Sequence, residues 1–210
     1  MAKKMSEMAC QDFVGALAAK TSVPGGGGAS ALVGAIGVAL CSMVGDFTLG
    51  RKKYAQFEED VHRMLAEGEK IQSDLLMLID DDAKAFEPLS KAYAIPKDDP
   101  QREAVMEKAL MDASLAPLNI MRKCCEAIDL LEEMLEKGSV MLISDVGCGA
   151  LFAKAALIGA SFNIYINTKS FSNRAEAEKI ENEVAAMLET YQLKADQIAS
   201  AVSSKIRGEA

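Results

Sequence analysis

The chain has 210 residues, of which 50% are hydrophobic and 26% charged, which is typical of one soluble globular domain with a substantial core. Its formal net charge of −8 argues against nucleic acid or an anionic membrane surface as the main partner. Five cysteines without CxxC spacing indicate reduced thiols, and no basic, apolar signal segment opens the chain, so we expect a cytoplasmic protein. A single histidine, His62, excludes a multi-histidine metal site.

Helical periodicity begins near the N-terminus and dominates the chain. The first amphipathic helix is predicted over residues 6–20, with Phe13, Val14 and Leu17 facing inward. Four consecutive glycines follow in VPGGGGAS at residues 23–30, and they allow positive φ angles and close backbone approach. Residues 29–45 behind them carry no charge and are nearly all small or apolar, so we expect this helix at the centre of the fold.

Three other interpretations of this stretch compete. A membrane span needs roughly 17–25 apolar residues, and the 17 before Asp46 are at the short limit and rich in alanine and glycine. A P-loop would require Gly-Lys-Ser/Thr after the glycines, and a dinucleotide-binding fingerprint would require a preceding strand. A purely structural turn and buried helix remains open.

The middle of the chain predicts two long helices. A basic cluster at residues 50–54 marks a turn, after which periodicity continues towards Tyr93. Asp99 and Pro100 are suited to begin the next helix, as a cap and a first-turn proline. We expect Pro117 to kink or break that helix, and Gly138 to cap its C-terminus.

The last third predicts two more helices. Ser144 and Asp145 can cap a glycine- and alanine-rich helix that extends to about Lys169. Asn173 and Glu176 have capping-box spacing ahead of the final amphipathic helix. The whole pattern predicts an all-α, single-domain bundle of six to eight helices over residues 1–210.

Polar residues on apolar helix faces are the candidate functional groups, because burial without a partner is costly. Asp82 falls in the middle of an apolar arc, whereas Asp80 points nearly opposite and Asp81 to the side. A solvated face explains Asp81, while a buried carboxylate at position 82 must be paired or functional. Asn163 and Asn167 share a narrow small-residue face, where they either join helices or line a ligand slot.

Other polar groups carry weaker signals. Asp145 is either an N-cap or a free carboxylate. The cluster of Arg51, Lys52 and Lys53 is either a solvated charge run or a site for a carboxylate tail. A thiol–base pair of Cys148 and His62 would require a contact that nothing in the sequence indicates.

Four stretches together resemble the cyclodeaminase/cyclohydrolase family of folate enzymes. They are VPGGGGAS at residues 23–30, GRKKY at 50–54, LIDDDAKAF at 78–86, and SDVG at 144–147 running on to NIYIN at 163–167. The likeness covers almost the whole chain in the right order. The chain departs from the family pattern at Gly28, where serine is common, and at Gly138-Ser139, where Gly-Asn is common.

The resemblance implies an all-helical subunit that forms a homodimer and binds a folate in a cleft. It implies a methenyl-tetrahydrofolate cyclohydrolase, which adds water to the one-carbon bridge, or a formimino-tetrahydrofolate cyclodeaminase, which expels ammonia. Because no formiminotransferase domain is present, we favour the cyclohydrolase. No metal or redox cofactor and no nucleic-acid or membrane partner is implied.

Site residues carried over with the resemblance fall into two groups. Asp82 or Asp145 is the expected general acid and base, and the other orients the pterin or water. Asn163 and Asn167 are expected to bind the pterin edge or the developing oxygen. The remaining expected substrate-binding residues are Gly25, Gly26, Gly27, Ser30, Lys52, Lys53, Asp80 and Ser144, with the lysines meeting the glutamate tail. Two other classes stay open: a non-catalytic folate-binding module, and a small membrane or interaction protein.

Overall fold

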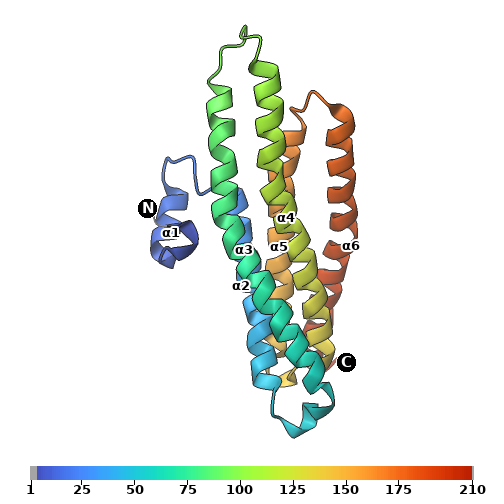
Figure 1. Ribbon diagram of the computed structural model, residues 1–210. Coiled ribbons are helices and arrows are strands. Elements are labelled where there is room, and N and C mark those ends of the chain that lie inside the picture. Colours follow the sequence, from blue (N-terminus) through green and yellow to red (C-terminus); the bar gives the residue numbers. More distant parts are fainter. Residues whose placement is uncertain (1–3, 210) are drawn as a thin grey trace.

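The computed structural model describes residues 4–209, and within this range it contains six α helices, three 3₁₀ helices and no β strand (Figure 1). The all-α prediction is therefore confirmed. In chain order the elements are η1 (Met5–Glu7), α1 (Cys10–Ala18), α2 (Gly26–Thr48), η2 (Lys52–Phe57), α3 (Glu58–Tyr93), α4 (Arg102–Lys137), η3 (Val140–Leu142), α5 (Ile143–Thr168) and α6 (Arg174–Arg207).

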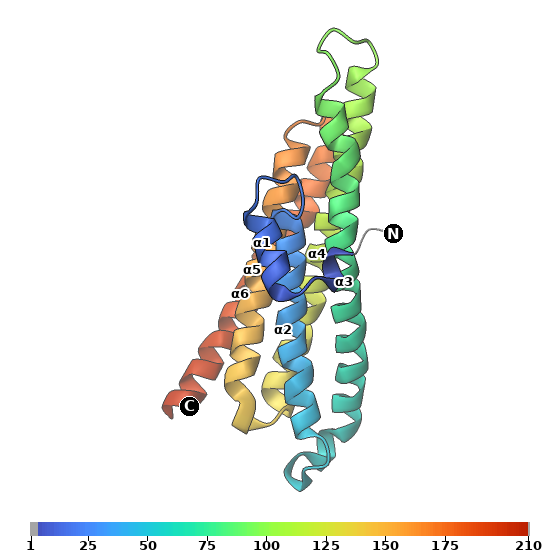
Figure 2. The same ribbon diagram turned by 90° about the vertical axis from the view of Figure 1, so that its left-hand side faces the viewer.

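Helices α2 to α5 form a four-helix bundle in which α2 packs against α3, α4 and α5. The last helix, α6, lies against α4 and α5, on the side away from α3 (Figure 1). Seen from the side, α5, α2 and α3 stand next to one another, and the short α1 stands off in front of them (Figure 2). Helix α2, which carries no charge before Asp46, thus packs against three neighbours, as its composition predicts.

Glycines bring α2 and α5 into backbone contact. A Cβ atom at Gly37 would lie 2.9 Å from the carbonyl oxygen of Gly149, and one at Gly149 would lie 2.8 Å from the carbonyl oxygen of Gly37. Real Cβ atoms do not approach other atoms so closely, so the two helices could not pack at this distance with larger residues. The two helices run antiparallel, because Gly26 at the start of α2 faces Asn163 near the end of α5.

Both α2 and the stretch Val140–Thr168 are long and apolar enough to cross a membrane by length and composition. The core helix of a helical bundle gives the same signal, and 56% and 44% of the two apolar windows are buried in the protein. Much of the rest lies on an outer surface that includes the exposed side chains of Ile36, Phe47, Leu151 and Phe162. We call this surface the α2/α5 apolar face.

The N-terminal helix differs from its prediction. It covers only Cys10–Ala18, with a 3₁₀ turn before it, and Phe13 is its one buried residue. Val14 and Leu17, expected to face inward, are 62% and 39% exposed. The reason is that α1 stands in front of the bundle (Figure 2) and buries only Phe13.

The glycine run does not form a loop with positive φ angles. Helix α2 begins at Gly26, and in the described part of the chain only Gly50 and Gly208 have positive φ. The glycines therefore do not use the positive φ angles that they allow, whereas they do permit close backbone approach. Helix α2 consequently extends three residues further towards the N-terminus than the predicted start at residue 29.

Other helix ends match the predictions only in part. Pro117 does not break α4, which is continuous through it. The helix starts at Arg102, and Asp99 instead accepts a hydrogen bond from the Gln101 N–H at 2.8 Å. Asp145 lies in the first turn of α5 and is not its N-cap, which is Leu142. The Gly138 C-cap and the Asn173 N-cap are confirmed, the latter accepting from the Glu176 N–H at 3.3 Å.

Candidate active site

A cavity of about 250 Å³ lies at the start of α2. Helix α2 begins lower in the bundle than the upper ends of α3 and α5 (Figure 2), and the cavity is lined by its first turn and by α3, α4 and α5. The lining residues come from the α1–α2 connection, the first turn of α2, and helices α3, α4 and α5. They are Ser22, Val23, Gly25, Gly26, Gly27, Asp82, Phe86, Ala113, Pro117, Asn163, Ile166 and Asn167.

Asp82 presents a carboxylate to this cavity from the middle of α3. Its Oδ2 accepts a hydrogen bond of 3.0 Å from the N–H of Gly28, in the first turn of α2. A Cβ atom at Gly27 would overlap the same carboxylate, so this position must be glycine for the acid to sit where it does. The positive end of the α2 dipole also favours a carboxylate here.

Partial burial raises the pKa of the Asp82 carboxyl above its ordinary value, and the hydrogen bond from Gly28 opposes that rise. No cation pairs with Asp82 in the described residues, where its one hydrogen-bond partner is the Gly28 N–H. A carboxyl group with a raised pKa and a free oxygen is suited to accept and return protons.

Two amides face Asp82 across the cavity from α5. Asn163 donates its Nδ2 to the carbonyl of Gly159 at 2.9 Å, which leaves its side-chain oxygen available as an acceptor. A Cβ at Gly26 would be 3.5 Å from the same amide, so the absence of side chains in the first turn of α2 keeps this wall open. Asn167 is 9% exposed and also lines the cavity. The site therefore combines an ionisable group with amide donors and acceptors, which suits a planar, polar ring.

Two predicted site residues on the same helices have structural roles. The Ser30 hydroxyl donates to the Gly26 carbonyl at 2.8 Å and packs against Gly159, so it is not part of the cavity wall. Asp80 accepts hydrogen bonds from the Met5 N–H at 2.7 Å and the Ser6 hydroxyl at 2.6 Å. It anchors the N-terminal segment to α3 on the side away from the cavity.

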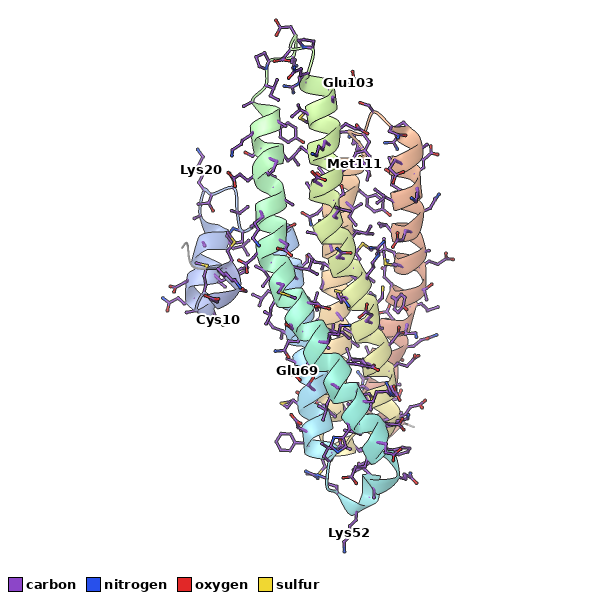
Figure 3. All side chains as sticks on the ribbon, in the orientation of Figure 1. Cys10, Lys20, Lys52, Glu69, Glu103 and Met111 are labelled. Carbon is purple, nitrogen blue, oxygen red and sulfur yellow. The ribbon has the colours of Figure 1, made fainter. Side chains whose placement is uncertain are left out.

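The other predicted group lies at the opposite end of the bundle. Asp145 and Asn163 are separated by eighteen residues of α5, which corresponds to about 27 Å at a rise of about 1.5 Å per residue. Lys52 and Lys53 are exposed in η2, beyond the far end of α2 (Figure 3). Ser144 precedes Asp145 and is also exposed. The structure does not bring these four residues to the Asp82 cavity of the same chain.

Several cavity residues were not predicted as site residues. Phe86 is one turn after Asp82 and Ile166 three residues after Asn163, so helical spacing could have found them. Ala113 and Pro117 come from α4, which carries no polar signal at this point, and the sequence pattern does not reveal them. Ser22 and Val23 line the cavity because of the course of the α1–α2 connection, which helical periodicity does not predict.

The cysteines and the histidine lie outside this site. All five cysteines are free thiols; Cys10 and Cys148 are exposed and the others are buried. Burial raises the pKa of the Cys41 thiol to about 12 and that of Cys125 to about 12, so these thiols are inert at neutral pH. Cys148 lies on α5 and His62 on α3, and neither lines the cavity.

Comparison with known proteins identifies relatives over nearly the whole chain. Residues 9–186 match the family model described as formiminotransferase-cyclodeaminase. A methenyltetrahydrofolate cyclohydrolase from Methylorubrum extorquens is 38% identical over 93% of this chain and 96% of its own length. A mouse formimidoyltransferase-cyclodeaminase is 28% identical over 89% of this chain, which spans only 35% of that longer protein.

A solved structure shares the fold. The crystal structure of a formiminotetrahydrofolate cyclodeaminase from Thermotoga maritima superposes with a TM-score of 0.83 and 26% sequence identity, covering 98% of each chain. The similarity therefore extends over all six α helices described above and is not confined to the glycine run.

Proposed function

Because this chain belongs to the formiminotransferase-cyclodeaminase family, we propose that it acts on the one-carbon unit of a tetrahydrofolate, as a methenyl-tetrahydrofolate cyclohydrolase. The observation that carries the proposal is Asp82, a partly buried carboxylate with a raised pKa in a cavity that also holds two amides. Two relatives match this chain over nearly their whole length, and the cyclohydrolase, at 38% identity, is more similar to it than the cyclodeaminase of known structure, at 26%, which favours the cyclohydrolase activity.

In the proposed reaction, water attacks the cationic carbon that bridges N5 and N10 of the folate. Asp82 accepts a proton from that water as the carbon–oxygen bond forms, and its negative charge stabilises the neighbouring cation beforehand. The product of this step is a neutral tetrahedral carbon that carries a hydroxyl group.

The second step opens the ring. The hydroxyl group loses its proton and becomes a carbonyl while the bond from carbon to N5 breaks, and N5 takes up a proton. The result is 10-formyl-tetrahydrofolate and one released proton, which balances the positive charge of the starting cation. Asn163 and Asn167 orient the ring and the developing carbonyl oxygen. The chemistry needs no redox cofactor or metal ion.

Formimino-tetrahydrofolate cyclodeaminase is the second candidate. Several relatives, including the mouse protein and the Thermotoga maritima structure, are named as cyclodeaminases. In that reaction a folate nitrogen attacks the formimino carbon, ammonia leaves, and the methenyl bridge forms. The same carboxylate would move the protons, so the geometry of Asp82 serves both reactions equally.

The test is to incubate the purified protein separately with methenyl-tetrahydrofolate and with formimino-tetrahydrofolate while following absorbance of the methenyl chromophore. We expect accelerated loss of the chromophore in the first assay. Its appearance in the second would establish the cyclodeaminase instead. If neither rate exceeds the uncatalysed one, the chain is not an enzyme of this type and the non-catalytic folate-binding module gains support.

We further propose that the protein is a cytoplasmic homodimer that uses the α2/α5 apolar face. Two helices about 10 Å wide and about 35 Å long present roughly 700 Å², close to the roughly 800 Å² per partner of a stable interface. Monomers rarely expose apolar patches of that size. Asp145, Lys52 and Lys53 lie too far from Asp82 to serve the cavity of their own chain, so any catalytic part they play requires a second subunit.

Mixing two inactive variants separates these cases. If Asp82 and Asp145 serve one site from different subunits, Asp82→Asn and Asp145→Asn dimers that exchange subunits should regain about a quarter of the wild-type activity, because half of the dimers are mixed and each has one intact site. If the mixture stays inactive, Asp145 does not act across an interface. A monomeric mass in solution would contradict the dimer itself.

A further inference from the structure

Pro117 lies within α4, and both Pro117 and the residue one turn before it, Ala113, line the cavity. In a regular helix the carbonyl of residue 113 would accept a hydrogen bond from the N–H of residue 117. Proline has no N–H, and its ring also pushes this carbonyl aside. The Ala113 carbonyl is thus deprived of its helical donor.

The position of this carbonyl follows from the geometry of the helix. Helical carbonyls point along the axis towards the residue four places later, and residues four apart lie on the same face. Ala113 and Pro117 both line the cavity, so a carbonyl that points from the first towards the second lies beside it. The neighbouring Ser114 hydroxyl does not supply the missing hydrogen, because it donates to the Leu110 carbonyl at 2.8 Å.

We propose that the Ala113 carbonyl, freed by Pro117, is a substrate-recognition group that accepts a hydrogen bond from the amino-substituted edge of the substrate's pterin ring. This rests on the proposed function, since a reduced pterin supplies ring N–H and amino donors along one edge. A buried acceptor without a donor is unfavourable. In the free enzyme the Ala113 carbonyl lacks a donor, and the bound ring supplies one.

The rest of the cavity fits this assignment. Asn163 and Asn167 approach from α5, and Asp82 and Phe86 from α3, so the α4 wall would otherwise offer the ring only apolar contacts. With the Ala113 carbonyl, the cavity has polar groups on three helices, enough to fix a planar ring in one orientation. A carbonyl oxygen on α4 accepts but cannot donate, which makes it selective for rings that carry a donor at that edge.

Pro117→Ala tests the proposal, because it restores the N–H and returns the Ala113 carbonyl to the helix. We expect KM for the folate substrate to rise about two- to tenfold, the equivalent of one neutral hydrogen bond, while kcat changes little. The dissociation constant of a reduced pterin without a glutamate tail, measured by calorimetry, should rise by the same factor. That second measurement does not depend on turnover.

Pro88→Ala is the matched control. Pro88 also lies inside a helix, α3, and its replacement likewise restores an N–H, but it is exposed and does not line the cavity. We expect KM and pterin affinity to stay at wild-type values in this variant.

A pterin analogue that lacks the 2-amino group completes the test. Wild-type protein should bind it more weakly than the parent pterin, and Pro117→Ala should discriminate between the two less, as expected when one interaction is removed from either side. Equal pterin affinity of wild type and Pro117→Ala, with both folded, would overturn the assignment. If the wild-type protein binds neither folate nor pterin, the proposed function itself fails, which is a different outcome.

Discussion

The two ends of the bundle carry similar polar residues in different surroundings. The cavity lies towards the upper end in Figure 1, and η2 and the start of α5 lie at the lower end. At the upper end, Asp82 is partly buried, contacts one backbone N–H and faces a cavity. At the lower end, Asp145 is partly exposed in the first turn of α5, and Lys52 and Lys53 are solvated. Asp82 and Asp145 therefore differ in burial and in whether a cavity lies beside them, a difference that the sequence motifs do not show.

At the lower end, polar side chains form hydrogen bonds that hold connecting segments together. The buried Thr48 hydroxyl donates to the Val44 carbonyl at 2.7 Å and accepts from the Ser139 N–H at 2.8 Å. The Tyr54 hydroxyl accepts from the Val140 N–H at 3.0 Å. These contacts attach the short link before α5 to the turn after α2. The tyrosine of the GRKKY stretch thus fixes the fold here, whatever its lysines do.

The largest difference in kcat/KM is expected between variants of Asp82 and of its neighbour on α3, Asp81. Asp82→Asn should lower kcat/KM by about 10²- to 10⁴-fold, because it removes the proton acceptor while an amide oxygen can still receive the Gly28 N–H. Asp81→Asn is the control, since Asp81 is exposed and pairs with Lys84 at the surface. Rates with methenyl-tetrahydrofolate, together with circular dichroism of both proteins, provide the measurement. Near-normal turnover of a folded Asp82→Asn protein would remove Asp82 from the mechanism.

Gly27→Ala should have the next largest effect on rate. The added methyl group would overlap the Asp82 carboxylate and rotate it out of place, and misplacing a catalytic group by about 1 Å can cost about 100-fold. Unfolding free energy should change less than the rate, because a short side chain and not the backbone must move. Gly15→Ala, where a Cβ meets nothing within 4 Å, should leave the rate unchanged. Equal rates for both variants would show that the carboxylate position is not critical.

The pH dependence should report Asp82 directly. In the proposed mechanism Asp82 is a general base that is active when ionised, so kcat/KM should fall as pH drops through its pKa, at a pH above the ordinary Asp value of about 4. The acidic limb should be absent from the residual activity of Asp82→Asn. If that limb persists in the variant, it belongs to another group.

The free energy of unfolding should also depend on the ionisation of Asp82, but it should fall as pH rises, whereas kcat/KM should rise. Since the folded-state pKa is raised, the folded state binds the Asp82 proton more tightly than the unfolded chain does. The stability that this provides is present below the unfolded pKa and is lost as pH rises through the folded pKa. Denaturant titrations of wild type and Asp82→Asn across this range should therefore show wild type losing stability relative to the variant as pH rises.

The smallest effect on chemistry, though not on folding, is expected at the lower end. Thr48→Val leaves the Ser139 N–H without its partner and should cost about 1–3 kcal/mol of unfolding free energy. Ser42→Ala is a milder control, because the Ser42 hydroxyl bonds only back to Val38 in its own helix. Measured by urea denaturation, a loss for Thr48→Val no greater than for Ser42→Ala would show that this anchor contributes little.

By itself, the sequence determined the helical class and most helix positions, and it singled out Asp82, Asn163 and Asn167, which the structure places around one cavity. Periodicity places a polar residue on an apolar face whichever partners that face later meets, so these residues could be identified without coordinates. The uncharged run of residues 29–45 likewise identified α2 as a helix that packs against several neighbours.

Only the tertiary structure decided which of the predicted residues meet. Asp145 and Asp82 lie on different helices, and a one-dimensional pattern holds no information on how far along the bundle each one sits. The helical conformation of the glycines, the exposure of Val14 and the entry of Ala113 and Pro117 into the cavity depend equally on neighbours. Contacts between helices remote in the chain set each of these outcomes, and local propensity does not encode such contacts.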